Sequence, residues 1–571
     1  MRRPALVLLG AVLSLAGCAG AARAPGLAKW AESGDKYMVA ADHPLASKAG
    51  AGMLAHGGNV VDAAVATSFA LSVTRPYSMG IGGGGFMIIH RVGKEPVVLD
   101  YREAAPLAAS ADKYLDEQGN IIEGKTVRGH WAVGVPGQVK GLAYALENYG
   151  TKSLHEVLQP AIQLAWEGIR VDEHTHEAMS KLAAYIKEHP EEKALYQEIA
   201  RIYLKDGEPY RVGERLKQEE LAKTLRLLAD GGADAFYKGV ISRRILDDMR
   251  TQLGPMTALD LGTYEVKVRK PLRGTFRGYD VIGMPPPSSG GACLLQVLNV
   301  IGGYDPKTTP EADYYHVLAE SMKHAFADRA AYLGDADFHP EVSADVARMI
   351  SSEHAAKVRA AIRPDRVSDA TEYGRRWLGD DGGTSHYSVI DKDGNAVAAT
   401  ETINLYFGSY VVPHGTGIIL NNELDDFAVK TGVPNEFGLL MSERNVIHSR
   451  QRPLSSMSPT MLLKDGRAVI AAGASGGPRI ITATLQTLLR IVDFSERPDA
   501  AVAAPRIHHQ WSPDVLRYEP GLSAAVRSVL SGRGHQMKEY DGSGVCQVVQ
   551  RDGKRLIGAS DPRKGGRPAG R

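Results

Sequence analysis

The chain has 571 residues, of which 44% are hydrophobic and 23% are charged, and these are ordinary proportions for a globular protein. Lys and Arg number 67 against 66 Asp and Glu, a formal net charge of +1 without a sustained basic stripe, which argues against nucleic acid as the main partner. A chain of this length buries a large core and favours two or more domains, although broad α/β layers can absorb it in one unit.

The N-terminal residues have the pattern of a bacterial export signal. Arg2 and Arg3 precede an apolar run over 5–17 that is too short to span a bilayer. Small residues end the run directly before Cys18, an arrangement that resembles the lipobox of bacterial lipoproteins, whereas an ordinary secretory signal cut nearby is the alternative. We therefore expect a signal peptide over 1–17 and a lipid on Cys18.

The expected location follows from this signal. Residues 18–34 are rich in Ala and Gly at their start and predict a flexible tether between the lipid and the folded body. No other apolar run is long enough to span a membrane, so the membrane is reached only through the lipid anchor. We expect the protein at the cell envelope, on the periplasmic face of a membrane; a soluble periplasmic or secreted protein is the alternative.

Helical patterns dominate the chain as far as residue 383. We expect an interrupted helix over 45–74, then strands, a helix-rich region, a Pro- and Gly-rich loop and a further helix. The ranges of these later elements are 86–91 and 96–100 for the strands, 138–249 for the helix-rich region (with helices at 154–167 and 243–252), 285–291 for the loop and 312–333 for the last helix.

Strand and turn patterns take over from Thr384. Residues 386–390 and 396–400 predict two strands joined by a turn that contains Asp393-Gly394. A Gly-rich loop over 473–477 precedes a helix expected over 480–492. Sheets covered by helices, an α/β fold, are the class that this order favours.

Three sequence features resemble nucleotide or metal sites but lack residues that such sites need. The glycines over 80–85 lack the Lys-Ser/Thr ending of a phosphate-binding loop, and the turn at 391–395 has no Glu at the twelfth position that an EF-hand needs. Cys293 and Cys546 form no zinc-binding spacing, and the sequence leaves open whether they pair. We expect no metal and no organic cofactor.

The segment before and after Thr384 contains a candidate nucleophile. Gly382 and Gly383 allow backbone conformations that hold the Gly383 carbonyl near the Thr384 hydroxyl. Attack of this hydroxyl on the carbonyl gives an ester that water then splits, which leaves an N-terminal threonine whose α-amine can act as the general base. The tripeptide alone is common, so the hypothesis depends on other segments; nearby His386 is assigned no role.

Three other segments provide what acyl transfer requires. The glycines before the helix at 480–492 can supply paired amides for an oxyanion hole. Residues 421–427 offer acceptors for a substrate ammonium, and residues 452–458 offer hydroxyl donors for a carboxylate.

These motifs together closely resemble the gamma-glutamyltransferase (gamma-glutamyl transpeptidase) family over about residues 38–570. The matching stretches are 100–103, 402–408, 421–427, 452–459, 476–477 and 561–566. The resemblance implies an N-terminal-nucleophile hydrolase fold, a four-layer αββα sandwich. It also implies self-cleavage between Gly383 and Thr384 into a large subunit (35–383) and a small catalytic subunit (384–571) that remain together as a heterodimer.

The resemblance further implies roles for single residues. Thr384 is the nucleophile, Thr402 orients it, and the amides of Gly476 and Gly477 form the oxyanion hole. Six residues are implied to hold the charged end of a γ-glutamyl group: Arg102, Ser455 and Ser456 its α-carboxylate, and Asn404, Glu423 and Asp426 its α-ammonium.

The implied reaction is a ping-pong transfer of the γ-glutamyl group from glutathione or a related amide to water, an amino acid or a peptide. Glu423 stands where many bacterial members have Gln, and Phe437 stands where a lid tyrosine is frequent, which leaves the behaviour of the lid open. Two alternatives are a glutaryl-type cephalosporin acylase of the same fold and a lipoprotein that binds γ-glutamyl peptides without cutting them.

Overall fold

The computed structural model describes residues 26–369, 383–542 and 544–571. The expected signal peptide and Cys18 lie outside this part of the chain, as does most of the expected tether. The end of the tether is different from the expectation, because residues 31–34 form a strand that pairs with Leu556–Ala559, and the Trp30 indole donates to the Asp499 carbonyl at 3.0 Å. None of the described helices is both long enough and apolar enough to cross a membrane.

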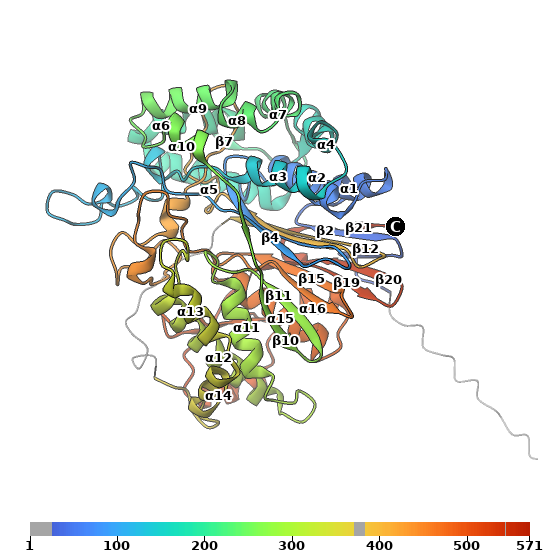
Figure 1. Ribbon diagram of the computed structural model, residues 1–571. Coiled ribbons are helices and arrows are strands. Elements are labelled where there is room, and N and C mark those ends of the chain that lie inside the picture. The colour runs from blue at the N-terminus through green and yellow to red at the C-terminus, as the bar shows by residue number, and fades with distance from the viewer. Residues whose placement is uncertain (1–25, 370–382, 543) are drawn as a thin grey trace, which may run out of the picture.

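Two seven-stranded antiparallel sheets form the centre of the molecule (Figure 1). The first sheet contains, in spatial order, β1 (Ala31–Gly34), β20 (Arg555–Ser560), β19 (Val545–Asp552), β15 (Arg467–Ser475), β14 (Thr460–Lys464), β11 (Tyr279–Gly283) and β10 (Leu272–Phe276). The second contains β21 (Ala569–Gly570), β2 (Tyr37–Ala41), β12 (Thr384–Asp391), β13 (Ala396–Thr402), β3 (Gly84–His90), β4 (Val97–Tyr101) and β9 (Lys267–Arg269). Both sheets therefore combine strands from either side of residue 383.

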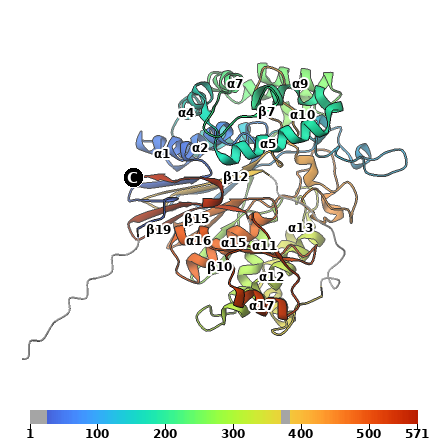
Figure 2. The same cartoon turned by 180° about the vertical axis from the view of Figure 1, so that it is seen from behind.

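The sheets stack face to face, and helices cover both outer faces (Figures 1 and 2). The second sheet is covered by α1 (Pro44–Ala55), α2 (Val60–Thr74), α3 (Gln138–Tyr149), α4 (Leu154–Glu167) and α5 (Glu173–Glu188). The first sheet is covered by α11 (Gly290–Ile301), α12 (Glu311–Tyr332), α15 (Arg479–Val492) and α16 (Pro498–Ala503). This arrangement is the four-layer αββα sandwich that the family resemblance implies.

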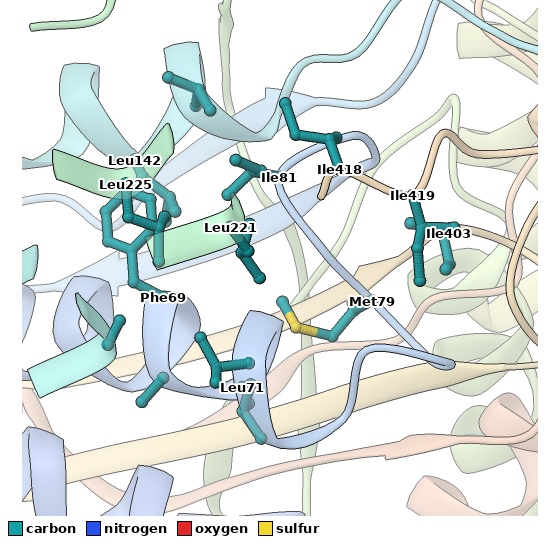
Figure 3. Packing of buried hydrophobic residues seen from close by; sticks show 14 of the residues in the cluster. Phe69, Leu71, Met79, Ile81, Leu142, Leu221, Leu225, Ile403, Ile418 and Ile419 are labelled. Carbon is teal, nitrogen blue, oxygen red and sulfur yellow. The ribbon is translucent and has the colours of Figure 1, made fainter. Parts of the chain in front are cut away.

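Neighbouring residues of one strand belong to different apolar clusters. On β2, Met38 and Ala40 pack into the cluster that includes the first sheet and its helices, whereas Val39 and Ala41 pack beneath α1 and α2. This alternation is the period of two that a strand buried on both faces requires. Figure 3 shows part of the second cluster, in which Met79 and Ile403 belong to the segments around the candidate nucleophile.

The expected helices are confirmed. The interrupted helix over 45–74 is α1 and α2, and Asn59 caps the start of α2 and forms a capping box with Asp62. The helices expected over 154–167, 312–333 and 480–492 are α4, α12 and α15.

Two expected loops are shorter than predicted because their glycines permit close packing. Residues 473–475 belong to β15, since a Cβ on Gly473 would lie 2.3 Å from the His386 ring and only glycine fits the sheet there. α11 likewise begins at Gly290, within the expected loop over 285–291, where a Cβ would lie 2.3 Å from the Ser458 hydroxyl.

Candidate active site

Thr384 is the first residue of β12 and lies opposite Thr402, the last residue of β13. Its hydroxyl donates to the Gly383 carbonyl at 2.8 Å, and the Thr402 hydroxyl donates to the same carbonyl at 2.7 Å. The two hydroxyl oxygens are 3.2 Å apart. The hairpin therefore places two hydroxyl groups on the carbonyl of the peptide bond that the sequence identifies as the cleavage point.

Gly383 occupies a position without room for a side chain. A Cβ there would lie 2.9 Å from the Tyr77 carbonyl oxygen, 3.1 Å from Ser78 Cα and 3.2 Å from Tyr406 Cδ1. The Phe407 amide donates to the Tyr77 carbonyl at 2.9 Å, so the two segments that pack against Gly383 are hydrogen-bonded to each other. Glycine is required here for the close approach of the backbone.

Asn404 connects the candidate nucleophile to the residues expected to bind substrate. Its amide donates to Thr402 Oγ1 at 2.8 Å, and its side chain donates to the Asn422 carbonyl at 3.0 Å. Its φ of +74° lies in the left-handed region, which Asn tolerates better than most residues. Glu423 follows Asn422 directly, so this strained turn fixes the distance between Thr402 and the candidate ammonium site.

Gly476 and Gly477 connect the end of β15 to the start of α15. Their φ angles are +123° and +55°, and their carbonyls accept from the amides of Arg479 and Ile480 at 3.1 Å each. α15 therefore begins directly at the pair, and its N-terminal end favours negative charge. Phe437, at the expected lid position, packs on the second glycine, where a Cβ would lie 2.9 Å from its ring.

Lys564 joins these two parts of the site, a role that the sequence analysis did not assign. Its buried ammonium donates to the Thr384 carbonyl and to Asp42 Oδ2 at 2.8 Å each and lies 3.5 Å from Ser475 Oγ. The start of β12 is thus tied to the residue before Gly476. The sequence signal that could have identified Lys564 is the stretch 561–566, which matches the family and in which Lys564 ends a short turn.

Arg102 is the centre of a buried ionic cluster. Its guanidinium pairs with Glu423 and Asp426, lies 3.6 Å from Glu103 and donates through Nε to the Pro453 carbonyl at 3.3 Å. Burial lowers the pKa of Arg102, but the three carboxyl groups raise it more, so the group stays charged. The structure therefore brings together residues expected to bind opposite charges, and they pair with one another.

This cluster contains more acid than base. Burial raises the pKa of Glu103 to about 7, and neither of its carboxylate oxygens has a hydrogen-bond partner among the described residues. Burial also raises the pKa of Glu423 well above its usual range despite Arg102. Surplus buried carboxyl groups suit a ligand that brings its own cation. Glu103 was not assigned from the sequence, although it follows Arg102 in a matching stretch.

Ser455 and Ser456 lie in the segment next to this cluster. Both are buried, and the Arg102 bond to Pro453 holds their segment beside the guanidinium. Ser455 Oγ accepts from the Met457 amide at 3.1 Å, and its carbonyl accepts from the Ser289 amide at 2.8 Å. The hydroxyl proton of Ser455 therefore remains available to a ligand.

His386 and the two cysteines are buried in surroundings that do not suit a catalytic role. Burial lowers the pKa of His386 to about 3, and its ring bonds to the hydroxyls of Thr400 and Ser388 at 2.8 and 3.0 Å. Cys293 and Cys546 are free and buried, which answers the question of pairing that the sequence left open. Burial raises their pKa values to about 12 and about 11, so their thiols are poor nucleophiles.

A four-layer αββα sandwich with a threonine at the start of a central strand defines the class of N-terminal-nucleophile hydrolases. The family model for Gamma-glutamyltranspeptidase matches residues 46–571, and the chain belongs to this family of enzymes. The glutathione hydrolase proenzyme of Pseudomonas sp. (strain A14) is 41% identical over 545 residues, which cover 95% of this chain and 91% of the relative.

Solved structures show the same similarity. The gamma-glutamyltranspeptidase of Helicobacter pylori is 41% identical with a TM-score of 0.54, over 58% of this chain and 93% of that chain. The cephalosporin acylase of Bacillus halodurans is 27% identical with a TM-score of 0.83, over 97% and 98% of the two chains. The fold is therefore shared by enzymes with these two names, and the residues of the site must separate them.

Proposed function

We propose that the protein is a gamma-glutamyltransferase and glutathione hydrolase that matures by cutting itself between Gly383 and Thr384. The observation that carries this proposal is the contact of the Thr384 and Thr402 hydroxyls with one carbonyl, that of Gly383. Thr384 Oγ attacks the Gly383 carbonyl carbon, the peptide C–N bond breaks, and the hydroxyl proton passes to the departing nitrogen, which becomes the free amine of Thr384. Water hydrolyses the resulting ester and frees the threonine hydroxyl.

The mature enzyme repeats this chemistry on its substrate. The free α-amine of Thr384 takes the hydroxyl proton, Oγ attacks the γ-carbonyl of glutathione or a related amide, and the leaving amine receives the proton. The amides of Gly476 and Gly477, at the start of α15, stabilise the oxyanion. The γ-glutamyl ester then passes to water, an amino acid or a peptide. The reaction uses no metal and no organic cofactor.

The ionic cluster around Arg102 supports a substrate that carries both an ammonium and a carboxylate. The ammonium enters among Asn404, Glu423 and Asp426, while the carboxylate takes Arg102 and the hydroxyls of two serines, Ser455 and Ser456. Such a ligand exchanges the internal ion pairs for its own. Holding the far end of the substrate in this way orients its γ-carbonyl against Thr384.

The acylase of the same fold is the second candidate, and the whole-chain similarity to the Bacillus halodurans enzyme favours it. A glutaryl side chain has no ammonium, so Glu423, Asp426 and the substrate carboxylate would share Arg102 without the second cation that a γ-glutamyl group brings. Turnover of γ-glutamyl and glutaryl anilides tests the choice. A preference for the glutaryl anilide would overturn our proposal, and turnover of neither would favour the binding lipoprotein.

We also propose that the protein is anchored to a membrane of the cell envelope through a lipid on Cys18 and faces the periplasm. The apolar run before Cys18 supports this proposal. Mass spectrometry of the N-terminal peptide from membrane-associated protein is the test. A mature chain that begins without an acylated Cys18 would leave a soluble periplasmic or secreted enzyme. The large and small fragments should purify together, because each sheet contains strands of both.

A further inference from the structure

Arg329 of α12 is a buried cation with unused hydrogen-bond donors. The residue is 1% exposed, and neither Nη1 nor Nη2 has a hydrogen-bond partner among the described residues. With the residues that the structure describes, its side chain makes one hydrogen bond, from Nε to Ser289 Oγ at 3.0 Å. A guanidinium stays charged in proteins, and an unpaired charge in the interior is costly. The position therefore favours an anion that arrives with a ligand.

The surroundings of Arg329 lead to the substrate site. Ser289 donates through its hydroxyl to the Ser455 carbonyl at 2.7 Å and through its amide to the same carbonyl at 2.8 Å. Two hydrogen bonds thus separate the guanidinium from Ser455. Burial lowers the pKa of Arg329, and nearby Cys293 and then Asp426 of the ionic cluster offset part of this lowering. The cation therefore lies behind the serines that the proposed function assigns to the α-carboxylate.

The charges of the occupied site support this placement. Arg102 and the ligand ammonium bring two positive charges to the occupied site, which also contains Glu103, Glu423, Asp426 and a ligand carboxylate. Burial raises the pKa of Glu103 to about 7 and that of Glu423 well above its usual range, so one of these two glutamates holding a proton leaves three negative charges. Arg329 then supplies the third positive charge. A balanced cluster is what a buried site requires.

We propose that Arg329 is a second cation of the α-carboxylate site and that its free Nη groups bond to the substrate carboxylate, directly or through one water molecule. This inference rests on the proposed γ-glutamyl function. Arg329 is a specificity-determining residue, because it acts on the end of the substrate that does not react. It selects donors with an α-carboxylate over donors without one.

Two donors and two substitutions test this role. The γ-glutamyl anilide carries both charged groups, and the 4-aminobutyryl anilide is the same molecule without its carboxylate. R329M should raise KM for the first by about 10- to 100-fold and leave KM for the second within about 3-fold, because only the first loses a charged hydrogen bond. R329K, which keeps the charge but not the planar fork, should give a smaller rise.

Lys323 provides a matched control on the same helix. It is equally buried but fully paired, with Glu320 and Asp514 at 3.2 Å each and the Ser368 carbonyl at 2.8 Å. K323M should lower Tm and leave the ratio of the two KM values unchanged. R329M should not lower Tm of the free protein, because it removes an unpaired charge.

Binding gives a readout that does not depend on turnover. Free L-glutamate should raise Tm of the wild type more than 4-aminobutyrate does, and R329M and R329K should reduce this difference. An unchanged donor ratio and an unchanged glutamate shift in both variants would overturn the role of Arg329 while the proposed function stands. A wild type that ignores the γ-glutamyl anilide would instead refute the proposed function. If R329M fails to fold, R329K gives the same comparison.

Discussion

Thr402 provides a specific prediction about self-cleavage. In the uncut chain its hydroxyl donates to the Gly383 carbonyl at 2.7 Å. When Thr384 adds to this carbonyl, the oxygen becomes an oxyanion, and the Thr402 hydroxyl is then a charge-assisted donor to it. The substitution T402V keeps the shape of the side chain and replaces this hydroxyl with a methyl group. We expect the variant to cut itself slowly.

The expected size follows from the change in charge on the oxygen. A neutral hydrogen bond contributes about 1 kcal/mol, whereas loss of one oxyanion donor costs about 3 kcal/mol, a factor of roughly 10² to 10³ in rate. T402V also leaves the Asn404 amide without its acceptor, which lies at 2.8 Å in the wild type. A loss of unfolding free energy of about 1–3 kcal/mol should therefore accompany the slower cleavage.

The assay is the appearance of the two fragments with time on a denaturing gel. T400V is the control, because Thr400 lies on the same strand and its hydroxyl bonds to His386 at 2.8 Å instead of to the scissile carbonyl. It should lose stability without a comparable loss of cleavage rate. Cleavage of T402V at a rate within about 3-fold of T400V would refute the oxyanion role of Thr402.

Three other substitutions follow from the same structure. Burial raises the pKa of Glu401 to about 7, so between pH 4.5 and about 7 the native state holds a proton that the unfolded state has lost, and the free energy of unfolding falls as pH rises. In denaturant titrations, E401Q should remove about 3 kcal/mol of this fall. A decline as steep as that of the wild type would contradict the role of Glu401. G477A puts a Cβ 2.9 Å from the Phe437 ring at a φ of +55°, so the loop must shift and kcat should fall by at least 10-fold. Activity within 2-fold of the wild type would disprove an oxyanion role of the Gly477 amide. K564M leaves Asp42 buried without its cation and should cost about 3–5 kcal/mol by thermal unfolding, whereas a loss below about 1 kcal/mol would show that the pair is dispensable.

The main elements could be predicted because their signals are local, whereas Thr384 was expected to be the nucleophile only because several distant segments match one family. Helical periodicity and the turn at Asp393-Gly394 define α4, α15 and the hairpin that carries Thr384. The residue facing Thr384 across that hairpin follows from the register, which places Thr402 opposite it. The meaning of glycine in the sequence was less clear, because this residue type forms a loop at Gly476 but allows close packing inside a strand at Gly473.

The long-range ionic contacts could not be predicted in the same way. Lys564 is joined to Asp42 across more than 500 residues, and no periodicity relates the two positions. Arg102 was expected to bind the carboxylate of a ligand and Glu423 and Asp426 its ammonium, but only the structure shows that these residues pair with one another. The two Nη groups of Arg329, which have no hydrogen-bond partner among the described residues, likewise become visible only when burial and hydrogen bonds are known.

The central claim is that Thr384 is both the cleavage point and the nucleophile. Intact-mass spectrometry of the purified protein, mixed briefly with a slow γ-glutamyl donor, tests both parts in one measurement. We predict a small fragment that begins at Thr384, ends at Arg571 and carries one γ-glutamyl group on Thr384, whereas T384A should remain a single unmodified chain. An active wild type that stays intact, is cut elsewhere or carries the acyl group on another residue would contradict this account.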